Sequence, residues 1–185
     1  MQAIETQELL ARNRDYSKTH IPIKTAAEQI TANKGNPYEG TRPPIPVVIS
    51  CLDSRIIPDQ FLKLSPSEVI VIRNIGGRVN DSIILQIAAL GTLRPIGDIL
   101  VVHHVDCGAT KVREEFVRAK LTEKYGQDSR IDSLVVGAIA DLPQSLRDDV
   151  EILRREKLID SGTRITGLLY DIKTGLVEEV CKATK

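Results

Sequence analysis

Residues 46–55 read Pro46-Val47-Val48-Ile49-Ser50-Cys51-Leu52-Asp53-Ser54-Arg55. The run from Val47 to Ile49 is apolar and β-branched, as in a strand that is buried on both faces. A cysteine follows this run closely, and an acidic and a basic residue follow the cysteine. The stretch therefore predicts a buried strand with reactive side chains at its carboxyl end.

Strands and helices are predicted to alternate along the rest of the chain. Runs similar to the first strand occur at 68–72, 98–102 and 133–138. Helical periods, in which apolar residues recur every three to four positions, occur near 83–91, 112–119 and 142–153, the first capped by Asn80 or Asp81. A terminal hairpin-like pair is expected at 163–170 and 176–180. This alternation predicts an α/β fold, with a mainly parallel central sheet and helices on both faces.

The first 44 residues differ from the rest. They are polar and are interrupted by turn formers such as Gly35-Asn36-Pro37. We expect residues 1–44 to form an N-terminal arm with helices near 5–13 and 24–32, and residues 45–185 to form one compact α/β domain.

Composition narrows the possible partners. The chain has 25 basic and 25 acidic residues, so no overall field attracts nucleic acid or an anionic membrane surface. A small neutral substrate fits this balance. We find no apolar stretch typical of a secretory signal or a membrane span, and we expect a cytoplasmic protein. In a reducing compartment, three cysteines favour metal binding or nucleophilic chemistry over disulfides.

A second string, His104-Val105-Asp106-Cys107-Gly108, follows the strand predicted at 98–102. If that strand and the first are parallel neighbours, Cys51, His104 and Cys107 converge at one edge of the sheet. Two thiolates and one imidazole suit Zn²⁺ and leave its fourth position open, as in catalytic rather than structural zinc sites. A helix beginning at Gly108 is expected to help hold Cys107 as a thiolate.

Asp53 and Arg55 are predicted to act beside this site. Arg55 can hold the Asp53 carboxylate by a bidentate pair, which lowers the pKa of the acid and fixes its orientation. An acceptor held in this way can orient a nucleophile bound to the metal. The alternative is a plain salt bridge within the loop.

Cys181 leaves a different reading open. As a fourth ligand it would close the site as Cys3His, and the protein would be a non-catalytic zinc-binding module. Its position near the end of the chain favours a free thiol instead.

These strings resemble the signature C-x-D-x-R and H-x-x-C of the β-class carbonic anhydrases. The similarity extends to four further segments: Asn13-Arg14-Asp15-Tyr16, Val71-Ile72-Arg73-Asn74-Ile75-Gly76-Gly77-Arg78, the helix start Asp81-Ser82-Ile83, and Tyr170-Asp171-Ile172-Lys173-Thr174-Gly175. Motif order and spacing are kept over nearly the whole chain. We therefore identify a resemblance to the small members of this family.

The resemblance implies a β-carbonic-anhydrase-like fold and reversible hydration of CO2 by zinc-bound hydroxide. Cys51, His104 and Cys107 would bind zinc, and Asp53 with Arg55 would orient the nucleophile. In a closed form of some members, the aspartate takes the fourth zinc position. The family also implies a homodimer or a multiple of dimers, in which residues 1–44 pack on a neighbouring subunit. His20 and His103 are candidates for moving the released proton, although His103 should point to the opposite face of its strand.

Two departures from the family bear on the substrate. Ile75 stands where the family usually has Ala, and Val105 where it often has Ser or Thr. Both changes make the neighbourhood bulkier and more apolar. Some relatives hydrolyse carbonyl sulfide (COS) or carbon disulfide (CS2), which are linear like CO2 but less polar, so hydrolysis of these molecules is the alternative function. Both residues are equally compatible with ordinary variation in a core.

Overall fold

The computed structural model describes residues 4–25, 27–28 and 43–184 of the chain. The chain divides into two units, Met1–Gly40 and Thr41–Lys185. In the first unit, helix α1 (Thr6–Tyr16) confirms the helix predicted near 5–13, and none of its residues is buried. The helix predicted over 24–32 falls largely outside the described residues.

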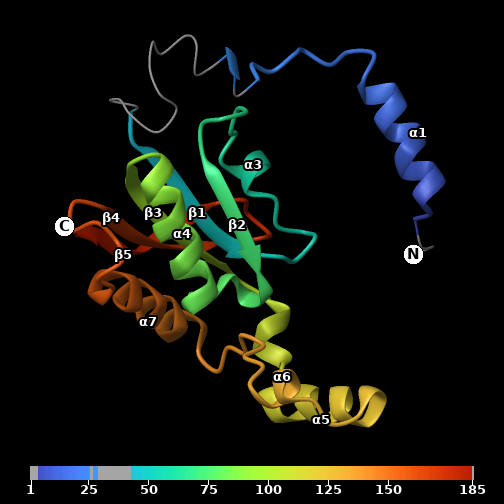
Figure 1. Ribbon diagram of the computed structural model, residues 1–185, viewed down its shortest axis with the longest axis vertical. Coiled ribbons are helices and arrows are strands. Elements are labelled where there is room, and N and C mark those ends of the chain that lie inside the picture. Colours follow the sequence, from blue (N-terminus) through green and yellow to red (C-terminus); the bar gives the residue numbers. More distant parts are fainter. Residues whose placement is uncertain (1–3, 26, 29–42, 185) are drawn as a thin grey trace. The chain divides into compact units, whose positions relative to one another are not determined.

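The second unit contains a five-stranded sheet with the order β2-β1-β3-β4-β5 (Figure 1). The strands are β1 (Ile45–Cys51), β2 (Ile70–Asn74), β3 (Ile96–His104), β4 (Arg164–Tyr170) and β5 (Val177–Thr184). The first four are parallel, and β5 pairs with β4 in the antiparallel direction. The predicted mainly parallel sheet and terminal strand pair are confirmed.

Strand register brings the two signature strings together. Strands β1 and β3 are neighbours, with Ser50 opposite Val102. Cys51 ends β1 and His104 ends β3, so both residues lie at the same edge of the sheet. This is the adjacency that the convergence of the predicted ligands requires.

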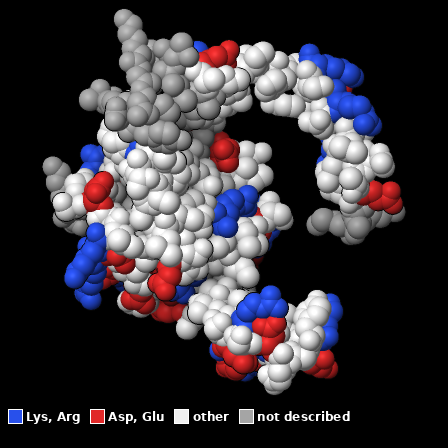
Figure 2. All heavy atoms as spheres, in the orientation of Figure 1, with Lys and Arg blue, Asp and Glu red and all other residues white. Residues whose placement is uncertain are grey.

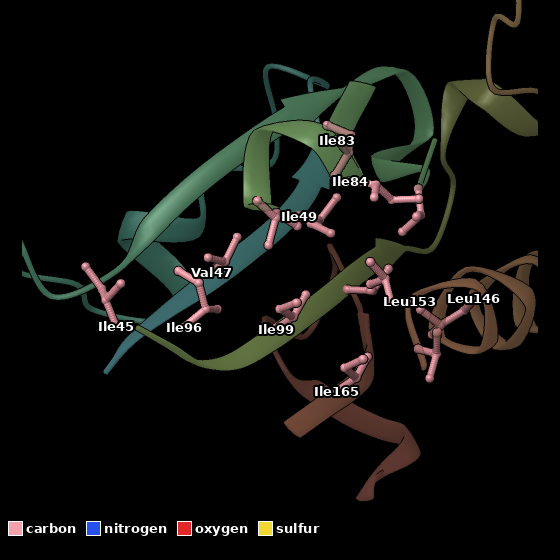
Figure 3. Close-up of a cluster of buried hydrophobic side chains, with 14 residues drawn as sticks. Ile45, Val47, Ile49, Ile83, Ile84, Ile96, Ile99, Leu146, Leu153 and Ile165 are labelled. Carbon is pink, nitrogen blue, oxygen red and sulfur yellow. The ribbon is translucent and has the colours of Figure 1, made fainter. Parts of the chain in front are cut away.

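Two helices cover one face of the sheet. Helix α4 (Asp81–Leu93) begins after Asn80, whose side chain accepts a hydrogen bond from the backbone N–H of Ile83, and α7 (Leu142–Arg155) begins after Asp141, which caps it in the same way. The core combines side chains of both helices with β1, β3 and β4 (Figure 3): Ile45, Val47, Ile49, Ile83, Ile84, Ile96, Ile99, Leu146, Leu153 and Ile165. Burial of this apolar set holds the sheet and the two helices together.

The opposite face carries a shorter element, α3 (Pro58–Phe61). The ring of Phe61 stacks on Tyr170, with 4.2 Å between the ring centroids. Tyr170 alternates along β4 with Ile165 and Leu169, which face the core under α7. Helices therefore lie on both faces, as predicted.

The strand predicted at 133–138 is wrong. This segment is irregular and follows α5 (Glu114–Tyr125) and α6 (Ser129–Asp132). Its backbone N–H groups from Val136 to Ala138 donate to the carboxylate of Glu114 rather than to a neighbouring strand. An apolar run alone does not specify a strand. Its backbone N–H and C=O groups must also pair with a neighbouring strand.

A buried polar network joins the end of β3 to α7. Asp149 accepts bidentate hydrogen bonds from Arg78, at 2.7 and 3.1 Å, and contacts His103 Nε2 at 3.1 Å. The other ring nitrogen of His103 lies 3.3 Å from Ser145 Oγ. His103 is fully buried and contacts Asp149 and Ser145 of α7, so it has a structural role here.

The surface shows mixed charge. On the face drawn in Figure 2, Lys and Arg side chains are interspersed with Asp and Glu. Within the described parts of the chain, no helix combines the length and the apolar character needed to cross a membrane.

Candidate metal centre

Cys51, His104 and Cys107 form one buried cluster. One ligand atom of each residue lies within 4.8 Å of the others, and the two sulfurs are 3.8 Å apart. The structure thus brings together all three predicted ligands. A disulfide is excluded, because it would need a sulfur separation of about 2.05 Å.

The backbone of the turn that follows β2 packs closely against Cys51. Element η1 (Ile75–Gly77) follows β2, and Gly76 and Gly77 have φ values of 74° and 67°. A Cβ on Gly77 would lie 2.9 Å from the backbone nitrogen of Cys51, so only glycine fits without displacing backbone. The N–H of Asp53 donates to the Cys51 sulfur at 3.4 Å.

Arg73 holds the loop that leaves Cys51. Its guanidinium donates to three backbone carbonyls: those of Cys51 at 2.9 Å, Asp53 at 2.8 Å and Ile56 at 2.6 Å. A single planar side chain therefore fixes the path of the chain through the first signature string.

His104 is oriented as a metal ligand. Its Nδ1 lies 2.9 Å from the carbonyl oxygen of Val105, and the N–H at this position donates to that acceptor. Its Nε2 is buried and has no hydrogen-bond partner among the residues that the structure describes. A buried nitrogen without a partner is costly unless something binds its lone pair.

The two thiols influence each other. A hydrogen bond from Cys107 lowers the pKa of Cys51 to about 4, and the neighbouring Cys51 sulfur raises the pKa of Cys107. The expected helix at Gly108 is a single 3-10 turn, η2 (Gly108–Lys111), and no α-helix begins there. A cation is what permits two adjacent thiolates, since a coordinated thiol is deprotonated outright.

The donor set fits zinc. Two zinc–sulfur bonds of about 2.3 Å at a tetrahedral angle separate their sulfurs by about 3.8 Å. The Cys51 and Cys107 sulfurs have this separation, and the free Nε2 of His104 supplies the third donor. Two sulfurs, one imidazole and no fourth protein ligand among the residues that the structure describes match an open tetrahedral site.

Asp53 and Arg55 form the predicted ion pair. Arg55 Nη2 donates to Asp53 Oδ2 at 2.7 Å, and Arg55 Nε lies 3.1 Å from Oδ1. Hydrogen bonds from Arg55 lower the pKa of Asp53 to about 2. The carboxylate next to the cluster is therefore ionised and fixed.

The same guanidinium also reaches the second signature string. Arg55 Nη1 donates to Asp106 Oδ2 at 2.8 Å, and Nη2 donates to the Asp106 carbonyl at 2.9 Å. Asp106 has a φ of 56°, a left-handed conformation that Asp and Asn tolerate better than most residues. Arg55 therefore ties the two ligand-bearing loops to each other.

Cys181 lies elsewhere. It pairs with Gly167 in the β4–β5 ladder, and its sulfur is 3.2 Å from where a Cβ of Gly167 would be. It is not one of the three residues in the cluster. The closed Cys3His arrangement is therefore absent from the described residues.

A cavity of about 420 Å³ opens beside η1. Leu52 and Ile75, the neighbours of Cys51 and Gly76, contribute to its wall, together with the segment around Val136. Ile75 remains 39% exposed, so the departure from the family's usual alanine places an apolar side chain at a surface and not in the core.

Comparisons with known proteins agree with this geometry. A family model described as carbonic anhydrase matches residues 46–135. β-Carbonic anhydrase 1 of Mycobacterium tuberculosis is 28% identical over 164 residues, covering 84% of this chain and 98% of the relative. A carbon disulfide hydrolase of Acidianus sp. is also 28% identical, over 148 residues, covering 69% and 72%.

A solved structure shares the architecture over almost the full length. The crystal structure of a carbonic anhydrase from Streptococcus mutans superposes with a TM-score of 0.76 at 26% identity, covering 97% of this chain and 99% of that one. Fold, motif order and sequence similarity agree. By sequence, motif order and fold, this chain is similar to the β-carbonic anhydrases.

Proposed function

We propose that this protein is a zinc-dependent carbonic anhydrase that hydrates CO2 reversibly to bicarbonate in the cytoplasm. The observation that carries the proposal is the buried cluster of two sulfurs and one unpartnered imidazole nitrogen. Cys51, His104 and Cys107 would hold the zinc. When bound, zinc acidifies a water molecule and so supplies a nucleophile at neutral pH.

The protein's own groups would orient the reaction. Asp53 is ionised because Arg55 donates to both of its oxygens, Nε to Oδ1 and Nη2 to Oδ2, so it can accept a hydrogen bond from the attacking water. Asp106 in turn accepts a hydrogen bond from Arg55, which holds the guanidinium and its carboxylate partner in place. His103 is buried and bonded to Asp149, so it is not available to carry protons to solvent.

Hydrolysis of COS or CS2 is a second candidate. The match to a carbon disulfide hydrolase supports it, as do the apolar side chains of Leu52 and Ile75 in the adjoining cavity. A less polar, longer linear molecule gains more from an apolar wall than CO2 does.

One side-by-side assay separates the candidates. Purified zinc-loaded protein is supplied with CO2, COS and CS2, and proton release from CO2 is compared with sulfide release from the other two. We expect CO2 turnover to dominate. Dominant sulfide release with negligible CO2 turnover would replace the first candidate by the second.

Removal of the Arg55 side chain should leave the Asp53 carboxylate without its ion-pair partner. In Arg55→Ala, the pKa of Asp53 should rise from about 2 toward the usual aspartate range, because its main hydrogen-bond donor is gone. In the original protein, this ion pair stabilises the fold at pH values above the usual pKa of an aspartate, and the stabilisation is lost as the pH falls toward 2. The variant should lack this stabilisation. We expect kcat/KM to fall by about 10- to 100-fold.

Carbon-13 NMR titration of the Asp53 carboxyl in both proteins tests this expectation. Arg130→Ala is a matched control, since it removes a similar arginine–aspartate pair, with Asp128, on α6. An unchanged Asp53 titration in Arg55→Ala would contradict the assigned role.

We also propose a homodimer or a multiple of dimers, with residues 1–44 packing on a neighbouring subunit and residues 45–185 forming the catalytic domain. Support comes from α1, in which no residue is buried and Leu9 and Leu10 are 52% and 45% exposed. In Leu9→Glu/Leu10→Glu we expect a smaller mass by light scattering. An unchanged mass would argue against this use of the arm.

A further inference from the structure

Glu114, at the start of α5, bonds a segment distant from it in sequence. Its Oε2 accepts from the backbone N–H of Val136 at 2.8 Å, and its Oε1 accepts from Gly137 at 3.0 Å and Ala138 at 3.2 Å. Three consecutive N–H groups that point at one carboxylate form an anion-binding nest, and here the anion is the Glu114 side chain of the same protein. Burial alone would raise the pKa of Glu114, but these donors outweigh it and lower the pKa.

The segment 136–138, which Glu114 binds, packs against the Gly76-Gly77 turn that contacts Cys51. Gly137 has a φ of 90°, and a Cβ added to it would lie 2.7 Å from the carbonyl oxygen of Ile75. A Cβ on Gly76 would in turn lie 3.0 Å from the Gly137 oxygen. Arg78 Nη1 donates to the Ala138 carbonyl at 3.0 Å and so adds a hydrogen bond between this segment and the residue that follows the glycine turn.

The same segment also reaches the second ligand loop. The N–H of Ile139 donates to the carbonyl of Ala109 at 3.0 Å. The side chains of Ile139 and Ala109 are buried in one cluster with Cys51 and Cys107. Both ligand cysteines therefore share a buried cluster with Ile139 of this segment.

Both ligand residues adjoin the residues that this segment touches. Gly77, the neighbour of Gly76, packs against Cys51, since a Cβ on Gly77 would lie 2.9 Å from the Cys51 nitrogen. Ala109 is buried in one cluster with Cys107. Contacts around metal ligands orient them, so a shift of the 136–139 backbone would change the surroundings of both sulfurs together.

We propose that Glu114 is a positioning residue for the metal centre, acting through the backbone of 136–139 on the η1 turn that packs against Cys51 and on Ala109 that packs with Cys107. The inference rests on the zinc site proposed above. Glutamine has nearly the shape of glutamate, but its amide nitrogen presents donors where the nest also presents donors. Glu114→Gln should therefore release the segment.

Zinc affinity of Glu114→Gln, measured by competition with a chromophoric chelator, is the first test. We expect the dissociation constant to rise by about 10- to 100-fold. Glu115→Gln is the matched control, because it removes the same charge from an exposed neighbour in the same first turn. It should bind zinc like the original protein.

The absorption spectrum of the Co²⁺-loaded variant separates positioning from loss of stability. We expect the thiolate-to-metal and d–d bands to shift in Glu114→Gln and not in Glu115→Gln. A lower urea midpoint with an unchanged spectrum and unchanged zinc affinity would mean a merely structural role and would overturn the inference. Absence of zinc binding in the original protein would instead overturn the proposed function itself.

A measurement on the unaltered protein covers the case in which Glu114→Gln does not fold. Coupling between two sites is reciprocal, so zinc should slow amide hydrogen exchange at 136–138 if this segment positions the ligands. Amides in the last turn of α5 should exchange at the same rate with and without zinc. Equal exchange at 136–138 in both states would contradict the inference.

Discussion

Cys51→Ser is expected to abolish tight zinc binding. The Cys51 sulfur lies 3.8 Å from that of Cys107, and serine would replace a soft, ionisable donor by a hydroxyl that does not ionise at neutral pH. Changes around metal ligands typically weaken binding by about 10- to 100-fold, and we expect loss of a ligand to weaken it by about 1000-fold or more. CO2 hydration should fall with the zinc content.

Metal analysis after gel filtration, together with competition against a chelator, measures this loss. Cys181→Ser is the matched control, because Cys181 lies on β5 and outside the cluster, and this variant should retain one zinc per chain. Zinc retained by Cys51→Ser, or lost by Cys181→Ser, would contradict the ligand assignment.

The second large effect is expected from Gly77→Ala. Gly77 has a φ of 67°, where a residue other than glycine costs roughly 1–2 kcal/mol. The added Cβ would also lie 2.9 Å from the Cys51 nitrogen, 3.0 Å from the Ser50 carbonyl carbon and 3.1 Å from the Val102 oxygen. All three are backbone atoms of β1 and β3, so relief requires the strands themselves to shift. We expect the free energy of unfolding to fall by about 3 kcal/mol or more.

Gly91→Ala provides the opposite control. Gly91 lies inside α4, and a Cβ there would meet nothing within 4 Å. Alanine should stabilise the helix by about 0.5–1 kcal/mol. Urea unfolding at one fixed protein concentration compares the two variants. Equal effects of the two substitutions would show that the contact between Gly77 and Cys51 has no energetic importance.

The sequence is sufficient to predict the mainly parallel character of the sheet, the pairing of its first strand with β3 and the convergence of the ligands. Apolar, β-branched runs identified β1 and β3, and the geometry of parallel strands then placed Cys51 and His104 at one edge. The Asp53–Arg55 pair was predictable because its members are two residues apart, and the structure shows it. These features depend on local periodicity or on a simple topological rule.

Contacts between segments distant in sequence were not predictable in this way. Gly76 and Gly77 could be recognised only as a turn, because the approach of Gly77 to Cys51 depends on how η1 packs. The segment at 133–138 was expected to be a strand, and nothing in its own residues reveals that Glu114 takes its hydrogen bonds. A glutamate some twenty residues upstream is not distinguishable in the sequence from the exposed Glu115.

Arg73 belongs to the same class. Its place in a family motif marks it, but its three carbonyl acceptors come from a loop roughly twenty residues earlier in the chain. Side-chain bonds to backbone leave no pattern in the sequence, because the acceptor is common to every residue.

The placement of β1 beside β3, with β2 on the outer edge, has a consequence for how the protein matures. Zinc fingers recruit their ion to closely spaced cysteines and histidines, so the ion can nucleate folding. Here the donors are brought within reach only after two non-consecutive strands have paired across a long crossover, a slow type of contact to form. Uptake of the ion during refolding should therefore follow the kinetics of sheet assembly and be independent of zinc concentration once zinc is in excess.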